Sequence, residues 1–114
     1  MDTQDLQNFL SEALKLDEAS VVKDAYGNIT GLKLTCPVKD EGAIVDALNF
    51  RRVLASDLAA SEGLSEQKKA ALMLSRLTGL SLGAIASMDG YDFNQANKVV
   101  GNFLTVPRRT GAVS

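Results

Sequence analysis

Residues 20–36 read SVVKDAYGNITGLKLTC, and this stretch decides which kind of fold to expect. Residues 20–25 have the composition of a strand, and apolar and polar residues then alternate over residues 29–36. Between the two runs, residues 26–28 read Tyr-Gly-Asn, and glycine and asparagine tolerate the positive φ angles of a tight turn. The stretch therefore predicts a β-hairpin with one buried face.

The alternation places Leu32, Leu34 and Cys36 on the buried face of the second strand. We expect Pro37 to end this strand or to place it at a sheet edge, because proline has no N–H to donate to a ladder. Cys36 is the single cysteine of the chain, so no internal disulfide can form. Its place in the pattern predicts a half-buried, inert thiol.

A third strand is expected after the polar turn at residues 39–42. It covers residues 44–51 and has Ile44, Leu48 and Phe50 on one side. The three strands would form an antiparallel meander with one buried and one solvated face.

Helical periodicity begins after residue 52. A short helix is expected over residues 53–61, with Leu54 and Leu58 turned inward and Gly63 as its stop. A longer helix is expected over residues 66–78, because a regular apolar stripe lies between a residue that can cap the start of a helix and a glycine that can end it. Its capping residue is Ser65, its stop is Gly79, and its stripe consists of Ala70, Met73, Leu74 and Leu77.

Two further helical segments are expected toward the end of the chain. Ser81 caps a short turn that runs to Met88, and Asp89-Gly90 breaks it. Asp92 then opens a last helix, which Pro107 closes. The apolar residues of that helix are Phe93, Ala96, Val99, Val100, Phe103 and Leu104.

The chain begins with an amphipathic pattern that predicts an N-terminal helix. Its apolar face would be formed by Leu6, Phe9, Leu10, Ala13 and Leu14. Strands followed by helices indicate an α+β fold: an N-terminal helix, a small three-stranded antiparallel meander, and three to four helices packed on one side. We expect a single domain over residues 1–107 and a mobile tail over residues 108–114.

The composition excludes several classes of function. The chain has no histidine, so a Ser-His-Asp triad and His-ligated metals are excluded, and one cysteine cannot build a zinc cluster. No glycine-rich phosphate loop occurs, and the acid pairs at 17–18 and 40–41 lie in predicted turns. We therefore expect no catalytic residue, no cofactor, no metal site and no enzyme. The acidic start is unlike a signal peptide, and no stretch is apolar enough to span a membrane, so a cytosolic protein is expected.

Charge is unevenly distributed along the chain. Residues 1–50 carry nine acids and four bases, whereas residues 51–114 carry five acids and eight bases. Such asymmetry can orient a partner or favour self-association. The basic half is too dilute to indicate nucleic acid by charge alone.

Residues 77–86 read LTGLSLGAIA, which is typical of the turn between two short helices in a helix-turn-helix. In that interpretation the helix from Asp92 to Leu104 would enter a DNA groove. It offers Lys98 as its only base, although DNA-binding helices need several cations to neutralise phosphates. A DNA-binding regulator is therefore an alternative hypothesis and not the favoured one.

A strand that ends in Cys-Pro-Val is followed by a second strand that reaches an arginine, and then by a helical part with several short motifs. The residues concerned are Cys36-Pro37-Val38, Arg51, Asp57-Leu58, Leu77-Thr78-Gly79-Leu80, Tyr91-Asp92-Phe93 and Phe103-Leu104. This order of elements, over residues 32–104, resembles the phage tail assembly chaperone family of tailed bacteriophages and prophages. Residues 1–31 lie outside the resemblance.

The resemblance implies a protein of the host bacterial cytoplasm that is absent from the mature virion. It implies that the protein keeps the long, apolar, helical tape-measure protein soluble while tail-tube subunits polymerise around it, so both are expected partners. A small structural tail-completion protein is a further alternative.

Helix-in-groove burial of apolar surface would be the binding mechanism. The candidate partner-binding residues share an apolar character and mostly lie around two glycines, in a segment where methionine suits an adaptable surface. They are Leu80, Leu82, Ile85, Met88 and Phe103.

Overall fold

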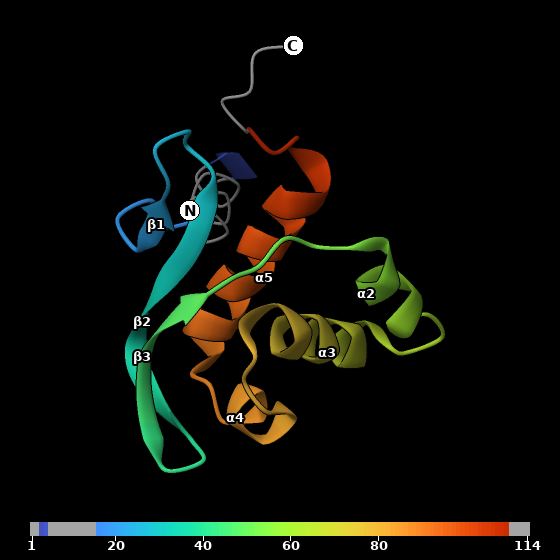
Figure 1. Ribbon diagram of the computed structural model, residues 1–114. Coiled ribbons are helices and arrows are strands. Elements are labelled where there is room, and N and C mark those ends of the chain that lie inside the picture. Colours follow the sequence, from blue (N-terminus) through green and yellow to red (C-terminus); the bar gives the residue numbers. More distant parts are fainter. Residues whose placement is uncertain (1–2, 5–15, 110–114) are drawn as a thin grey trace.

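The computed structural model describes residues 3–4 and 16–109, and it has a mixed α+β fold. Three strands form an antiparallel sheet in the order β1-β2-β3: β1 (Val21–Lys23), β2 (Ile29–Asp40) and β3 (Ala43–Asn49). The described helices lie together on one side of this sheet (Figure 1). They are α2 (Ala55–Ala60), α3 (Glu66–Thr78), α4 (Leu82–Ala86) and α5 (Gly90–Thr105). The meander with helices on one side is thus confirmed, and the N-terminal helix expected at residues 6–14 falls on residues 5–15, which are outside the described part.

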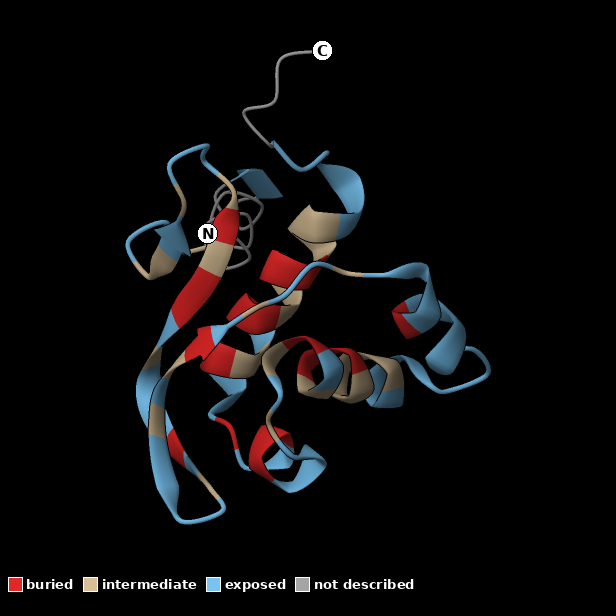
Figure 2. Ribbon diagram, viewed as in Figure 1, coloured by how far each residue is buried: buried red, intermediate tan, exposed pale blue. Residues whose placement is uncertain are grey.

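The core lies between the sheet and the inner faces of α3, α4 and α5 (Figure 2). Its fully buried members come from every layer, and they include Leu32, Leu48, Leu74, Ile85 and Val99. Only one face of the sheet packs against the helices. Leu32 and Leu48 lie on this face and are buried, which confirms the alternation predicted for these two positions.

Helix α3 covers the residues predicted for it, because both ends carry strong signals. The hydroxyl of Ser65 accepts a hydrogen bond from the Lys68 N–H at 3.3 Å. Gly79 ends the helix in the left-handed region, with φ of 78°, and donates its N–H to the Ser75 carbonyl. Inside the helix, Met73, Leu74 and Leu77 are buried, as the stripe predicted.

Pro37 does not end β2, which continues to Asp40. The ladder with β1 stops at Leu32, and the ladder with β3 is interrupted between Lys33 and Val38. Proline is tolerated there because no neighbouring strand requires its N–H. After this interruption Val38 pairs with Val45 and packs on the core, whereas Ile44 pairs with the exposed Lys39. Ile44 is therefore 66% exposed instead of packing beside Leu48.

The carboxylate of Asp92 replaces a strand partner in this interrupted part of β2. It accepts hydrogen bonds from the Thr35 N–H, the Thr35 hydroxyl and the Cys36 N–H, at 3.0 to 3.1 Å. Asp92 is 2% exposed, so these donors compensate its removal from water. Asp92 was expected to open α5, but the helix begins at Gly90 and its capping residue is Asp89, which accepts from the Tyr91 N–H.

Cys36 is exposed, which corrects the prediction of a half-buried thiol. Its backbone N–H donates to Asp92, while its side chain lies at the surface beside the start of α5. We expect Cys36→Ser to change the free energy of unfolding by less than about 0.5 kcal/mol, as is usual for exposed positions. The native protein should also react with one equivalent of a thiol-specific chromogenic disulfide without denaturant, because the chain has one cysteine. Labelling that requires unfolding would contradict this prediction.

Candidate partner-binding groove

The buried carboxylate of Asp57 fixes the position of α2. Arg51 forms a bidentate pair with it, at 2.8 and 2.7 Å, and the Arg76 guanidinium donates a third bond at 2.8 Å. The Leu54 N–H, at the start of α2, donates a fourth at 2.8 Å. The hydrogen bonds from Arg51, Leu54 and Arg76 hold the pKa of the Asp57 carboxyl well below its usual range. Through this carboxylate, α2 is connected to α3 and to the end of the sheet.

This arrangement reverses the predicted orientation of α2. Asp57 faces the protein interior, whereas Leu54, just before α2, and Leu58 are each 46% exposed. The prediction that both leucines point inward was therefore wrong. The spacing of Leu54 and Leu58 predicts an apolar stripe that faces the core. In the structure, the ion pairs of Asp57 occupy the inner face of α2 instead.

A groove of about 660 Å³ lies between α2, α3 and α5. Its floor consists of the buried Met73 and Val100. Three small residues, Ala59, Ala70 and Gly101, come from the three different helices and leave room for a partner's backbone to approach. The remaining lining residues are Leu58, Ser61, Glu62, Glu66, Lys69, Asn97 and Leu104.

Two exposed leucines stand at this groove. Leu58 on α2 is 46% exposed, and Leu104 near the end of α5 is 51% exposed. Polar side chains surround the apolar part, and one ion pair, between Lys69 and Glu66 at 3.6 Å, lies among them. An apolar floor with a polar margin is the arrangement that accepts the apolar face of an amphipathic helix.

The structure does not bring the five residues predicted from the sequence into one hollow. Ile85 and Met88 are core residues, 1% and 8% exposed, and Leu80 is half-buried against the same core. Leu82 is 53% exposed on α4. Phe103 lies on α5, where its ring packs edge-on against Phe50 with centroids 5.6 Å apart. Binding through these residues stays a prediction, and Leu82 is the member that a partner reaches most easily.

One group of potential metal ligands occurs among the described residues. Ligand atoms of Cys36, Asp89 and Asp92 lie within 4.8 Å of one another. Both carboxylates already have structural partners: Asp89 caps α5, and Asp92 binds the backbone of β2. We therefore interpret this group as the junction between β2 and α5 and assign no metal to it.

Helix α5 does not project from the protein as a DNA-recognition helix does. Asp92, Gln95, Ala96 and Val99 are buried, and its first turn is bonded to β2. The helix thus forms the centre of the core, and the helix-turn-helix interpretation gains no support from the fold. Within the described residues, no helix has the length and apolar character needed to cross a bilayer.

Comparison with known families identifies the chain's relatives. The family described as phage tail assembly chaperone proteins, E, or 41 or 14, matches residues 32–105. The chain belongs to this family. The matched segment includes all four described helices, most of β2 and the whole of β3, so the groove lies within the family's own region. No curated protein and no solved structure matched the chain.

Membership in the tail assembly chaperone family confirms the resemblance drawn from the sequence motifs. A protein of this family acts during phage tail assembly in the host cell and interacts with tail proteins. The groove between α2, α3 and α5 was not predicted from the sequence. No signal within a single segment indicated it, because Leu58 was expected to face the core and the groove combines residues of three helices.

Proposed function

We propose that this chaperone binds apolar helical segments of the tape-measure protein during tail assembly, without catalysing a reaction. The observation that supports the proposal is the groove between α2, α3 and α5, where Leu58 and Leu104 remain exposed at the margin of an apolar floor. The protein would act in the host bacterial cytoplasm and be absent from the mature virion, and the tail-tube protein would be a second partner.

The groove suits one face of an amphipathic helix. A guest helix that covers Leu58 and Leu104 would remove the exposed half of each side chain from water, which contributes about 1 kcal/mol per leucine. The guest's own apolar side chains would contribute more by contact with Met73 and Val100 on the floor. Such modest energies suit a chaperone that must release its partner when tube subunits replace it.

Co-expression with the cognate tape-measure protein tests the proposal. The wild-type chaperone should raise the soluble yield of the tape-measure protein several-fold. Leu104→Asp, alone and with Leu58→Asp, should abolish this gain, because a carboxylate in the groove would have to be desolvated by an apolar helix. Both positions are about half exposed, so the variants should fold, and circular dichroism and thermal unfolding would verify that they do.

Leu82→Asp is the matched variant, since Leu82 has similar exposure but lies on α4, outside the groove. If Leu82→Asp alone abolishes solubilisation, the partner binds at the α4 surface predicted from the sequence and not in the groove. If the wild-type chaperone gives no gain in soluble yield, the proposed partner is wrong.

A further inference from the structure

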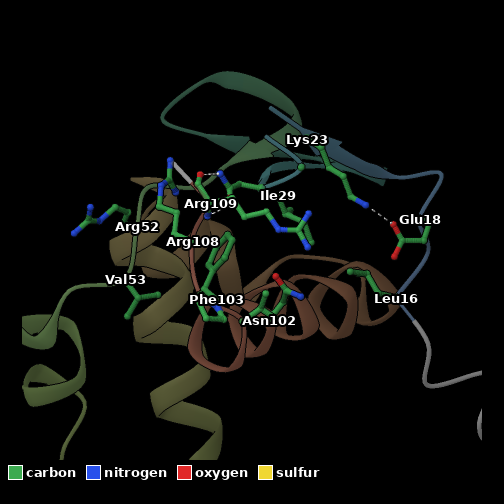
Figure 3. Close-up of a pocket in the computed structure, with 14 residues that line it drawn as sticks. Leu16, Glu18, Lys23, Ile29, Arg52, Val53, Asn102, Phe103, Arg108 and Arg109 are labelled. Carbon is green, nitrogen blue, oxygen red and sulfur yellow. Dashed lines mark hydrogen bonds and ion pairs between the residues drawn. The ribbon is translucent and has the colours of Figure 1, made fainter. Parts of the chain in front are cut away.

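A second hollow, of about 610 Å³, lies beside the end of α5 and shares no lining residue with the groove described above (Figure 3). It is formed by the turn between β1 and β2, the segment after β3, and the end of α5 with the residues that follow it. Its volume is within the range typical of ligand sites, about 300–1,000 Å³. We call it the basic hollow.

Four cationic side chains and one anionic side chain line the basic hollow. Lys23 pairs with the anionic one, Glu18, at 3.2 Å. The other three are Arg52, Arg108 and Arg109, which are all exposed. Within residues 16–109, no carboxylate lies within ion-pair distance of these three guanidinium groups. At longer range, the Asp24 carboxylate on the β1–β2 turn interacts with Arg108, and the hydrogen bond from the Asn28 side chain together with this interaction helps to lower the pKa of Asp24. The hollow therefore has an excess of positive charge that the described residues neutralise only in part.

The arginines are held there by a specific backbone contact. The side-chain amide of Asn28 accepts a hydrogen bond from the Arg109 N–H at 2.8 Å and donates one to the Arg109 carbonyl. Asn28 is itself held in place by the carboxylate of Asp24. This carboxylate accepts a hydrogen bond from the side-chain amide of Asn28 at 3.1 Å and another from the backbone N–H of Asn28 at 3.0 Å. The segment after α5 is thus attached to the β1–β2 turn, and Arg108 and Arg109 are kept beside the hollow.

The base of the hollow is apolar. Ile29 is buried, Val53 and Phe103 are half-buried, and Val106 is 45% exposed. A guanidinium group binds a carboxylate through two parallel hydrogen bonds, while an aliphatic floor favours an apolar side chain. Together they favour a ligand that carries both kinds of group.

From this combination of free guanidinium groups and an apolar floor, we propose that the basic hollow binds an acidic peptide segment of a protein partner, with carboxylates flanking a large apolar side chain. Single-stranded nucleic acid fits less well, because stacking needs open aromatic faces and the ring of Phe103 is half-buried against Phe50. This proposal does not depend on the groove or on the tape-measure protein.

Fluorescence anisotropy of the full chain with labelled dodecapeptides tests the proposal. The probe alternates glutamate with leucine and phenylalanine, and two control peptides replace either the glutamates with lysine or the apolar residues with serine. The acidic apolar probe should bind at least tenfold more tightly than either control, and its affinity should fall as salt rises. Equal binding of the three peptides, or tighter binding of a single-stranded DNA dodecamer, would overturn the proposal.

The double variant Arg52→Glu/Arg108→Glu should weaken binding of the probe at least tenfold. The side chains are exposed and not engaged in ion pairs with described carboxylates, so thermal unfolding should be close to that of the wild type. Lys39→Glu is the matched control, because Lys39 is exposed at the far end of β2, outside the hollow, and should leave the affinity within twofold.

Sedimentation of the free protein distinguishes a second copy from a foreign peptide. If the wild type forms dimers that the arginine variant and the probe both dissociate, the occupant is another copy of this chain, and the proposal of a separate partner is wrong. A monomer that binds the probe supports the proposal. Failure of the peptide to bind would leave the groove experiment with the tape-measure protein unaffected.

Discussion

Leu77→Ala is expected to lower the free energy of unfolding by about 2–4 kcal/mol. Leu77 is 2% exposed and belongs to the core cluster, so its truncation removes buried methyl groups and leaves a cavity. Its carbonyl also accepts the N–H of Arg51 at 3.0 Å, which anchors the end of α3 to the chain that leaves the sheet. This backbone bond limits how far α3 can move inward to fill the space, so we expect little relief by relaxation.

Urea unfolding followed by circular dichroism would measure this loss. Leu82→Ala is the matched control, since it deletes the same atoms from a side chain that is 53% exposed, and should cost less than about 1 kcal/mol. A loss below about 0.5 kcal/mol for Leu77→Ala would show that Leu77 is not in the core. A different face of α3 would then have to pack against the sheet.

Elements with local end signals were the predictable part of the fold. Helix α3 is bounded by Ser65 and Gly79, whose roles depend on backbone hydrogen bonds within a few residues, so its limits follow from the sequence. Helix α4 is similar, because the hydroxyl of Ser81 accepts from the Ala84 N–H at 3.1 Å. Local chemistry of this kind can be read without knowing the tertiary structure.

Features that depend on distant partners were not predictable. Pro37 was expected to end β2 or to place it at a sheet edge. Instead β2 is the middle strand and continues to Asp40, because Asp92, which is 55 positions later, binds the freed backbone of Thr35 and Cys36. Likewise, the outward orientation of Leu58 follows from the pairing of Asp57 with Arg51 and Arg76. Hydrophobic periodicity shows that a helix has an apolar stripe, but not whether a charge network occupies the opposite face and turns that stripe to solvent.

The groove escaped sequence analysis for a related reason. It is built from one small residue on each of three helices, Ala59, Ala70 and Gly101, and these are unremarkable within their own segments. By contrast, the segment from Leu80 to Met88 was predicted to bind the partner because four large apolar residues lie close together there. The fold uses Ile85 and Met88 to close the core beneath α4.

Asp57→Asn is expected to lower the free energy of unfolding by about 2–3 kcal/mol at pH 7. The asparagine side chain has the size of the aspartate side chain, but it is neutral and has only one acceptor oxygen. It therefore cannot accept both hydrogen bonds from Arg51 together with the one from Arg76. Breaking a fully buried pair costs more, about 3–5 kcal/mol. The smaller figure applies here because the side chains of Arg51 and Arg76 are 43% and 36% exposed, so water can solvate the guanidinium groups that lose their partner.

The pH dependence of this loss separates charge from shape. Hydrogen bonds from Arg51, Leu54 and Arg76 depress the pKa of folded Asp57 below the unfolded value of about 3.9. A depressed folded pKa means that the charged carboxylate contributes its full stability above about pH 5, and that this contribution declines as pH falls below about 4. The difference between wild type and Asp57→Asn should therefore be constant from pH 7 to about pH 5 and shrink in more acidic buffer.

Denaturant unfolding from pH 7 to pH 3 measures this difference, with Asp46→Asn on β3 as the control for an exposed aspartate. The control should remain within about 0.5 kcal/mol of the wild type at pH 7. A difference for Asp57→Asn that does not change down to pH 3 would mean that the carboxylate acts by shape and hydrogen bonding and not by charge. Because Asp57 also turns Leu58 toward the groove, the same variant should reduce solubilisation of the tape-measure protein at temperatures where the rest of the fold persists.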